Sequence, residues 1–123
     1  MLDHNIVFVE EFSDILDSLE SFLRETEDIT TKESIFYLFR NIHTLKGNSQ
    51  SIGHIQFGNY LHNLEDHLSF FLENIQVIDG PLIKEKFFAI LSELYSLYEI
   101  LKQNPDYKIL DNDLKDLYNL TSF

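Results

Sequence analysis

Residues 41–53, with the sequence NIHTLKGNSQSIG, have the pattern of half an amphipathic helix, and the interpretation of the chain starts from them. Side chains three or four positions apart share one helix face. The apolar or small members of that face are Ile42, Leu45, Ser49 and Ile52. The adjacent face carries His43, Lys46, Gly47 and Gln50. Glycine within a helix costs about 1 kcal/mol relative to alanine. We therefore interpret Gly47 as an opening through which a partner reaches the imidazole of His43.

The bulk composition describes one folded domain, which we assign to residues 1–123. The chain has 123 residues, 44% of them hydrophobic, with 11 Phe and 6 Tyr, so it can bury one core. The absence of Cys excludes disulfides and thiolate chemistry and fits a reducing compartment. The sequence has no apolar run long enough to span a membrane and no signal-peptide pattern. We therefore expect a soluble cytoplasmic protein without membrane insertion.

The charge of the chain excludes one class of partner. Its 9 basic and 21 acidic residues give a net charge of −12. Binding to nucleic acid needs a basic surface, so we exclude nucleic acid as a ligand. The acidic chain repels other acidic proteins, and a protein partner is expected to dock on a local patch around Lys46. One domain with one exposed site needs no dimer, so we expect a monomer.

Apolar side chains recur with the period of a helix, which predicts five helices and no strand. The expected helices cover residues 7–25, 32–52, 55–76, 81–103 and 110–120, after a short lead-in over residues 1–6. Thr31 is a candidate N-cap, Gly53 ends or bends the second helix, and Asp79-Gly80-Pro81 starts the fourth. Four long helices with short links predict an all-α antiparallel four-helix bundle with a short fifth accessory helix.

Aromatic residues at helical spacing are assigned to the core rather than to a cofactor site. The buried face expected for the second helix consists of Ile35, Phe36, Leu38, Phe39, Ile42, Leu45 and Ile52. Gly58, early in the third helix, is expected where that helix passes close to a neighbour.

Helix geometry predicts which residues lie level with His43. If the second and third helices are antiparallel and turn near Gly53, His43 lies about 15 Å before the turn. The returning helix then brings His62 and Glu65 to the same level, on one face. A carboxylate there can accept a hydrogen bond from Nδ1–H of His43 and select the tautomer with a free Nε2 lone pair. A neutral, oriented imidazole of this kind is a nucleophile.

These residues resemble a known family. The pattern His-x-x-Lys-Gly-x-x-x-x-x-Gly over residues 43–53 resembles the histidine phosphotransfer domain, in particular the version at the N-terminus of chemotaxis-type histidine kinases. HNLED at residues 62–66 has the His and Glu that support the phosphorylated His in that family, and FVEEF at residues 8–12 resembles its first helix. The resemblance covers roughly residues 8–72. It departs at Asn48, which is larger than the residues common there, and we expect its side chain to point away from the imidazole.

The resemblance implies a phosphoryl relay. Nε2 of His43 would accept the γ-phosphoryl group of ATP bound to a separate histidine kinase domain and pass it to an Asp of a response-regulator receiver domain. Lys46 would offset the phosphoryl charge. The other residues with implied roles are Glu65 and His62 in support, and Gly47 and Gly53 in access and packing. The chain has no Gly-rich phosphate loop, so we expect no cofactor in it. Mg-ATP would come with the kinase domain and Mg²⁺ with the receiver. The first-helix resemblance favours a chain that is the first domain of a histidine kinase.

Two other interpretations compete with the phosphotransfer domain. A non-catalytic helical adaptor, or a phosphotransfer-like domain that has lost its activity, would share the fold. A metal-binding bundle of the di-iron type needs Glu-x-x-His pairs, and no Glu of this chain has a His three positions later, so we expect no metal site. His4, His54 and His67 have no spacing argument and are expected to be ordinary surface or half-buried residues.

Overall fold

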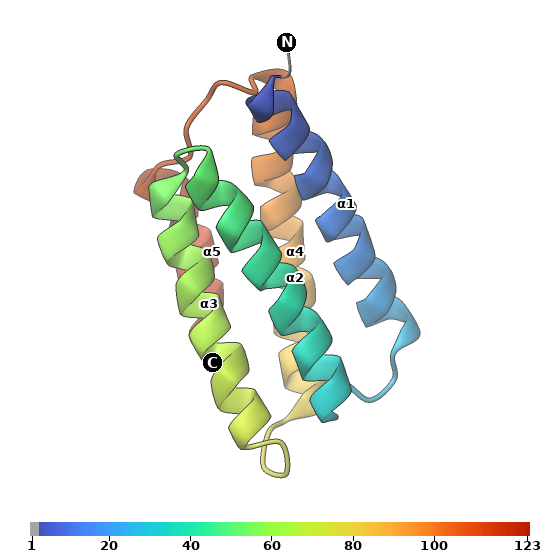
Figure 1. Ribbon diagram of the computed structural model, residues 1–123. Helices are drawn as coiled ribbons and strands as arrows, with labels where there is room; N and C mark the ends of the chain where they lie inside the picture. The colour runs from blue at the N-terminus through green and yellow to red at the C-terminus, as the bar shows by residue number, and fades with distance from the viewer. Residues whose placement is uncertain (1–2) are drawn as a thin grey trace.

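The computed structural model describes residues 3–123, which form helices and turns with no strand in that range (Figure 1). The elements in chain order are α1 (His4–Glu25), α2 (Lys32–Ser51), α3 (Ile55–Glu73), α4 (Gly80–Gln103), the 3₁₀ helix η1 (Asp111–Leu114) and α5 (Lys115–Leu120). The predicted all-α fold class is confirmed.

The four long helices form an antiparallel bundle in which α2 packs along α3 and α1 packs along α4 (Figure 1). Helix α1 also contacts α2, which joins the two pairs. The connection from α4 to η1 crosses the end of the bundle near the α2–α3 turn, and α5 then runs beside α3 (Figure 1). The predicted bundle with a short fifth helix is therefore confirmed, and it places α2 and α3 as close neighbours.

The N-cap of α1 explains why this helix begins earlier than predicted. The side chain of Asp3 accepts hydrogen bonds from the backbone N–H groups of Asn5 and Ile6, at 2.9 and 3.3 Å. These N–H groups have no partner within the helix, so a carboxylate at this position stabilises the first turn. The predicted lead-in is therefore helical from His4, and residues 1–2 lie outside the described residues.

Polar side chains also mark the other helix ends. The Thr31 hydroxyl accepts from a backbone N–H in the first turn of α2 at 3.1 Å, so the predicted N-cap is confirmed. Asp79 caps α4 in the same way at 3.0 Å. Helix α3 ends at Glu73, three residues earlier than predicted. The side-chain amide of Asn74, the next residue, donates a hydrogen bond to the backbone carbonyl of Phe70 at 2.8 Å.

Gly53 ends α2 and sets the geometry of the α2–α3 turn. Its φ of 91° is a left-handed conformation that glycine adopts without steric cost. The N–H of His54 donates to the carbonyl of Ser49 at 2.9 Å, and the N–H of Gly53 donates to that of Gln50 at 3.2 Å. These two bonds form a Schellman motif. A Cβ on Gly58 would lie 2.7 Å from the Gln50 side chain, so the close approach predicted at Gly58 is confirmed.

The core fills the centre of the bundle, with one departure from the predicted face of α2. Ile35 and Leu38 are fully buried, whereas Phe36 is 47% exposed and Phe39 is partly buried. The buried positions of α2 follow a spacing of three or four residues, and Phe36 lies beside that row rather than on it. The prediction that Phe36 is buried was therefore wrong.

His54 is buried in the structure, contrary to its prediction as a surface or half-buried residue. Its side chain is 1% exposed and lies against the ring of Phe8, with the ring centroids 5.2 Å apart. Nδ1 of His54 accepts a hydrogen bond from the backbone N–H of Ile109 at 3.2 Å. The α4–η1 connection is thereby attached to the α2–α3 turn, and Lys108 adds a bond to the carbonyl of Ile52 at 2.7 Å.

The C-terminal segment is attached to the bundle by aromatic contacts. The hydroxyl groups of Tyr60 and Thr121 lie 2.7 Å apart in the interior. The rings of Tyr60 and Tyr118 meet edge to face at 5.1 Å, as do those of Phe71 and Phe123. These contacts hold α5 beside α3, on the side away from the α2–α3 surface that carries His43.

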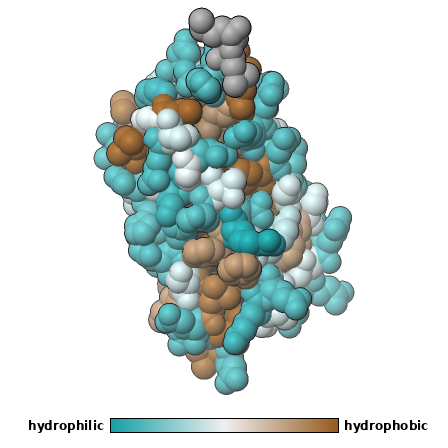
Figure 2. Space-filling model, viewed as in Figure 1, coloured by the Kyte–Doolittle hydropathy of each residue, from teal (hydrophilic) through white to brown (hydrophobic). Residues whose placement is uncertain are grey.

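The visible surface is mostly polar, with an apolar area between the lower parts of α2 and α3 and smaller apolar areas toward the top of the view (Figure 2). Within residues 3–123, no helix combines the length and the apolar character needed to cross a membrane.

Candidate functional site

His43 on α2 and Glu65 on α3 meet where helix geometry predicts. Nδ1 of His43 and Oε2 of Glu65 lie 2.5 Å apart. An ionised carboxylate can only accept a hydrogen bond, so Nδ1 is the donor, and in the neutral imidazole the lone pair is then on Nε2. The Schellman turn at Gly53 makes this contact possible, because it sets the register between the two helices.

Lys46 binds the other oxygen of the same carboxylate. Its Nζ lies 2.5 Å from Oε1 of Glu65, and the two side chains are 15% and 6% exposed. Partial exclusion of water makes such a pair stronger than one at the open surface, where ion pairs contribute little. Lys46, which was expected to offset a phosphoryl charge, offsets the charge of Glu65 in this structure.

The pKa of Glu65 reflects two opposing effects. Burial by itself raises the pKa of the carboxyl group, but the hydrogen bonds and charges of Lys46 and His43 outweigh it and hold the pKa below its usual range. Glu65 is therefore ionised at neutral pH, which is the state that fixes the tautomer of His43.

His62 lies at the edge of this cluster. Its Nδ1 is 3.5 Å from Oε1 of Glu65, and its Nε2 is 3.8 Å from a carboxylate oxygen of Asp66. Both distances are long for a hydrogen bond, and the side chain is 62% exposed. His62 therefore borders the carboxylate without holding it, and its supporting role stays a prediction.

The reactive edge of His43 faces solvent. The side chain is 62% exposed, and no residue in 3–123 forms a hydrogen bond with Nε2. A Cβ on Gly47, one turn further along α2, would meet no atom within 4 Å. Packing within the domain therefore does not require glycine at this position, which supports the access interpretation. Asn48 points away from the imidazole as expected, and donates to Glu11 on α1 at 2.9 Å.

Two phenylalanines extend the imidazole into a row of three rings along α2. The rings of Phe39 and His43 are nearly parallel, with centroids 6.0 Å apart, and those of Phe36 and Phe39 are nearly parallel at 6.2 Å. The guanidinium of Arg40 lies over the Phe36 ring, 5.4 Å from its centroid. Phe36 was predicted to lie in the core, and for Phe39, one turn before His43, the core was preferred to an exposed contact for a receiver domain. The spacing of seven residues between Phe36 and His43 is the signal that could have placed Phe36 in the same row.

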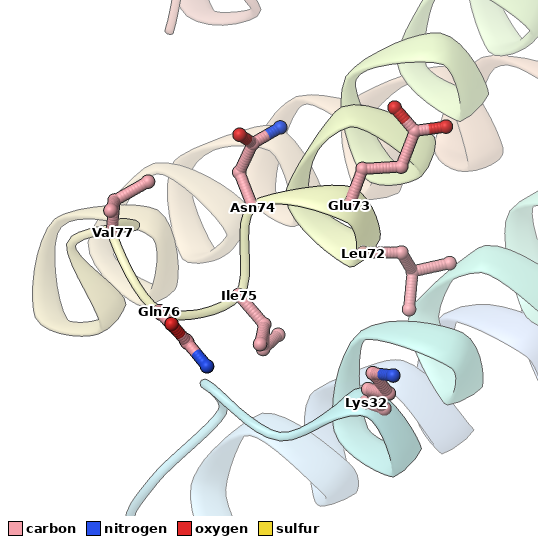
Figure 3. A pocket seen from close by; sticks show the side chains of 7 residues that line it. All are labelled: Lys32, Leu72, Glu73, Asn74, Ile75, Gln76 and Val77. Atoms are coloured by element: carbon pink, nitrogen blue, oxygen red, sulfur yellow. The ribbon is translucent and has the colours of Figure 1, made fainter.

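One hollow of the described surface lies far from His43. It has a volume of about 630 Å³ and separates the start of α2, at Lys32, from the α3–α4 connection around Ile75 and Val77 (Figure 3). Lys32 precedes His43 by eleven residues on the same helix, which corresponds to about 16 Å. This hollow is lined by both polar and apolar side chains and holds no histidine, so it gives no sign of a second phosphoryl-accepting site.

Within residues 3–123, no three His, Cys, Asp or Glu side chains cluster in a way that could hold a metal ion. His54 is buried at the α2–α3 turn, and His67 packs against Phe123 with ring centroids 5.2 Å apart. Neither residue reaches the cluster around Glu65.

Comparison with known proteins agrees with this geometry. The family model described as "Hpt domain" matches residues 6–104. The chain is 31% identical over 112 residues to the chemotaxis protein CheA of Borreliella burgdorferi, and the match covers 90% of this chain but 12% of that protein. This chain therefore corresponds to a small part of that relative. No solved structure matches the chain with significance. With a bundle fold, an exposed imidazole held by a carboxylate, and a family match over most of its length, the chain belongs to the Hpt domain family, the histidine phosphotransfer domains of two-component signalling.

Proposed function

We propose that this chain is the phosphoryl carrier of a chemotaxis-type relay and that His43 is the residue that carries the group. Nε2 of His43 attacks the γ-phosphorus of ATP held by a separate kinase domain. A nitrogen–phosphorus bond forms, the bond to the bridging oxygen breaks, and ADP leaves with that electron pair. The observation that carries the proposal is the 2.5 Å contact between Nδ1 of His43 and Glu65, which leaves Nε2 exposed and, in the neutral ring, selects the tautomer with the lone pair on Nε2.

The second step returns the imidazole to its starting state. A carboxylate oxygen of an aspartate on a receiver domain attacks the phosphorus, the nitrogen–phosphorus bond breaks, and its electron pair returns to Nε2. The proton on Nδ1 stays in the hydrogen bond to Glu65 throughout. The same nitrogen of the same tautomer thus receives the phosphoryl group from ATP and passes it to the receiver aspartate.

Glu65 and Lys46 act on this cycle through charge. Phosphorylation of Nε2 while Nδ1 keeps its proton makes the ring cationic, and the ionised carboxylate of Glu65 stabilises that charge where it develops. Lys46 keeps the carboxylate ionised and in place, with its Nζ 2.5 Å from Oε1. Phosphoryl transfer depends mostly on positioning and charge neutralisation, and both can be supplied by side chains already ordered in this domain.

The remaining components come from partner domains. Mg-ATP is bound by the kinase domain and Mg²⁺ by the receiver, so this chain works without a cofactor of its own. We place it in the cytoplasm as the first domain of a larger histidine kinase. The likeness of this chain to 12% of the length of a chemotaxis protein supports a place within a longer chain.

The test is a phosphorylation assay with the kinase core of a chemotaxis histidine kinase and labelled Mg-ATP. We expect label that is labile in acid and stable in base on the wild-type chain and on His67→Gln, and none on His43→Gln. His67 is a suitable control because it lies on α3 away from Glu65. Label that persists on His43→Gln would overturn the assignment. Absence of label on the folded wild-type chain, with an active kinase core, would favour a non-catalytic adaptor.

A further inference from the structure

Three cations lie on the two helices that form the site: Lys32, Arg40 and Lys46, all on α2. Lys46 is bound to Glu65 and 15% exposed, so its charge is already matched. Lys32 lies about 16 Å from His43 along the helix, at the edge of the hollow near the α3–α4 connection. Arg40 precedes His43 by three residues, which places it on the same side of α2, one turn away.

Arg40 is exposed and forms no ion pair with any carboxylate of residues 3–123. The chain has 21 acidic residues and a net charge of −12, so an unpaired arginine beside the reactive histidine is unexpected. Its guanidinium lies 5.4 Å from the ring centroid of Phe36 and 5.9 Å from that of Tyr37. Such stacking orders the side chain while all of its N–H donors stay available.

The surroundings of Arg40 are those of a contact surface. Phe36 is 47% exposed, and its ring continues through Phe39 to His43 in the row of three rings. Aromatic residues and arginine are the residue types enriched at the centres of protein interfaces. A partner that covers Nε2 of His43 and extends along α2 toward its start therefore meets Phe39, Phe36 and Arg40 in turn.

We propose that Arg40 is the residue by which this domain recognises its phosphoryl acceptor, through a bidentate pair with a carboxylate at the rim of the receiver's acidic site. The inference rests on the proposed function. An acceptor that uses an aspartate and binds Mg²⁺ through carboxylates has an acidic surface there, which the charge of −12 on this chain repels. Arg40 supplies the one matched charge that remains available on α2 near His43.

The position of Arg40 favours the receiver over the nucleotide as the source of the anion. Its guanidinium lies over Phe36, on the side of His43 toward the start of α2, rather than over the imidazole. The phosphates of bound ATP have to approach Nε2 itself for transfer to occur. A group one turn away instead meets the rim of the docked protein, where charged side chains set the rate of association and the choice of partner.

The experiment separates the two half-reactions. Arg40→Gln, Arg40→Lys and Lys32→Gln are each labelled by the kinase core, purified as phosphorylated domains, and mixed with a receiver domain that the wild-type chain phosphorylates. Lys32→Gln is the matched control because it removes the same charge from the same helix. The rate of transfer to the receiver is measured at several salt concentrations, and the rate of labelling by the kinase is measured separately.

We expect Arg40→Gln to lower the second-order rate constant of transfer to the receiver about tenfold at low salt and to flatten its salt dependence. Arg40→Lys should recover part of the loss, and Lys32→Gln should stay within about twofold of the wild type. Labelling by the kinase should be unchanged in all three. Equal rates for Arg40→Gln and Lys32→Gln at the receiver would overturn the inference.

Two further outcomes separate a failure of the receiver assignment from a failure of the proposed function. A loss for Arg40→Gln in the labelling step alone, or equally in both steps, would overturn the assignment to the receiver and indicate the kinase domain or its nucleotide. Failure of the wild-type chain to accept label would overturn the proposed function and, with it, the basis of this inference.

Discussion

Two histidines on the α2–α3 hairpin show how position decides the chemistry of an imidazole. His43 lies at mid-helix and is 62% exposed, and its Nδ1 donates to the carboxylate of Glu65 at 2.5 Å. His54 lies at the turn and is 1% exposed, and its Nδ1 accepts from the backbone N–H of Ile109 at 3.2 Å. In the neutral rings, the proton is therefore on Nδ1 in His43 and on Nε2 in His54.

The hydrogen-bond partner of one ring nitrogen therefore determines whether the other nitrogen carries a proton or a lone pair. In His43, the carboxylate leaves Nε2 as an exposed lone pair. In His54, Nε2 carries the proton, is buried, and has no hydrogen-bond partner in the described part of the chain. The first arrangement suits attack on phosphorus, whereas the second fits a neutral structural residue that attaches the α4–η1 connection to the hairpin.

The contrast between His43 and His54 is tested most directly by replacing each imidazole in turn. His43→Gln is expected to lose all phosphorylation while its melting temperature stays close to that of the wild type, because the side chain is largely exposed. His54→Gln is expected to keep its phosphorylation per folded molecule. Quantitative labelling with a kinase core, together with thermal unfolding, measures both. A labelled His43→Gln would remove the distinction between the two residues.

The second prediction concerns stability at low pH. Burial, followed by the charge of Lys108, lowers the pKa of His54 from 6.5 to about 4. Between these two pH values the unfolded chain binds a proton at this residue and the folded chain does not. The contribution of neutral His54 to the free energy of unfolding is therefore fully present above about pH 6.5. It is lost as the pH falls to about 4, which lowers the free energy of unfolding by about 3 kcal/mol at most.

Urea unfolding at several pH values measures this effect on the wild type and on His54→Gln. The fall in the free energy of unfolding between about pH 6.5 and 4 should be smaller in the variant. Glu65, whose pKa is also lowered, loses its contribution at lower pH, as the carboxyl group is protonated. Parallel curves for the two proteins would show that His54 does not titrate in this range.

The third prediction tests whether the carboxylate of Glu65 speeds phosphorylation of His43. Glu65→Ala removes the acceptor for Nδ1 of His43 and is expected to slow phosphorylation by about 10²-fold, because the ring loses both its fixed tautomer and its stabilising charge. Asp66→Ala is the matched control, since it removes the neighbouring carboxylate, which is 69% exposed and does not contact His43. Single-turnover labelling measures the rates. Equal rates for Glu65→Ala and the wild type would contradict the tautomer argument.

The smallest expected effect is at Gly47. A Cβ at this position meets no atom within 4 Å, so Gly47→Ala should stabilise the isolated domain by about 1 kcal/mol through helix propensity. Chemical denaturation measures this change. Gly47→Leu should also fold but transfer phosphoryl groups more slowly, because the larger side chain stands beside the imidazole. Destabilisation by alanine would contradict the open surface seen in the structure.

Much of the fold and of the carboxylate contact followed from local chemistry. The spacing of apolar residues predicted the helices, and the Thr31 cap and the turn at Gly53 were visible as residue types with fixed backbone preferences. Once the turn was placed, the rise per residue set the level of Glu65 relative to His43. That calculation needs no tertiary information beyond the antiparallel order of two neighbouring helices.

Other features were decided by packing. Phe36 and His54 were both assigned to the wrong environment, because a helix pattern does not show which edge of an apolar face a neighbouring element covers. The α4–η1 connection buries His54, whereas Phe36 lies under the Arg40 guanidinium and stays 47% exposed. Lys46 likewise lies within reach of Glu65 only because α2 and α3 pack side by side.

Residue types at short range along one or two helices were enough to predict the helical bundle, the family resemblance and a His43 whose Nδ1 donates to Glu65. The buried state of His54 with its hydrogen bond from Ile109, the pairing of Lys46 with Glu65, and the lack of an ion pair for Arg40 within residues 3–123 could be read only from the folded chain. Those properties depend on distances of a few ångströms between side chains from different helices, and on the water that packing excludes.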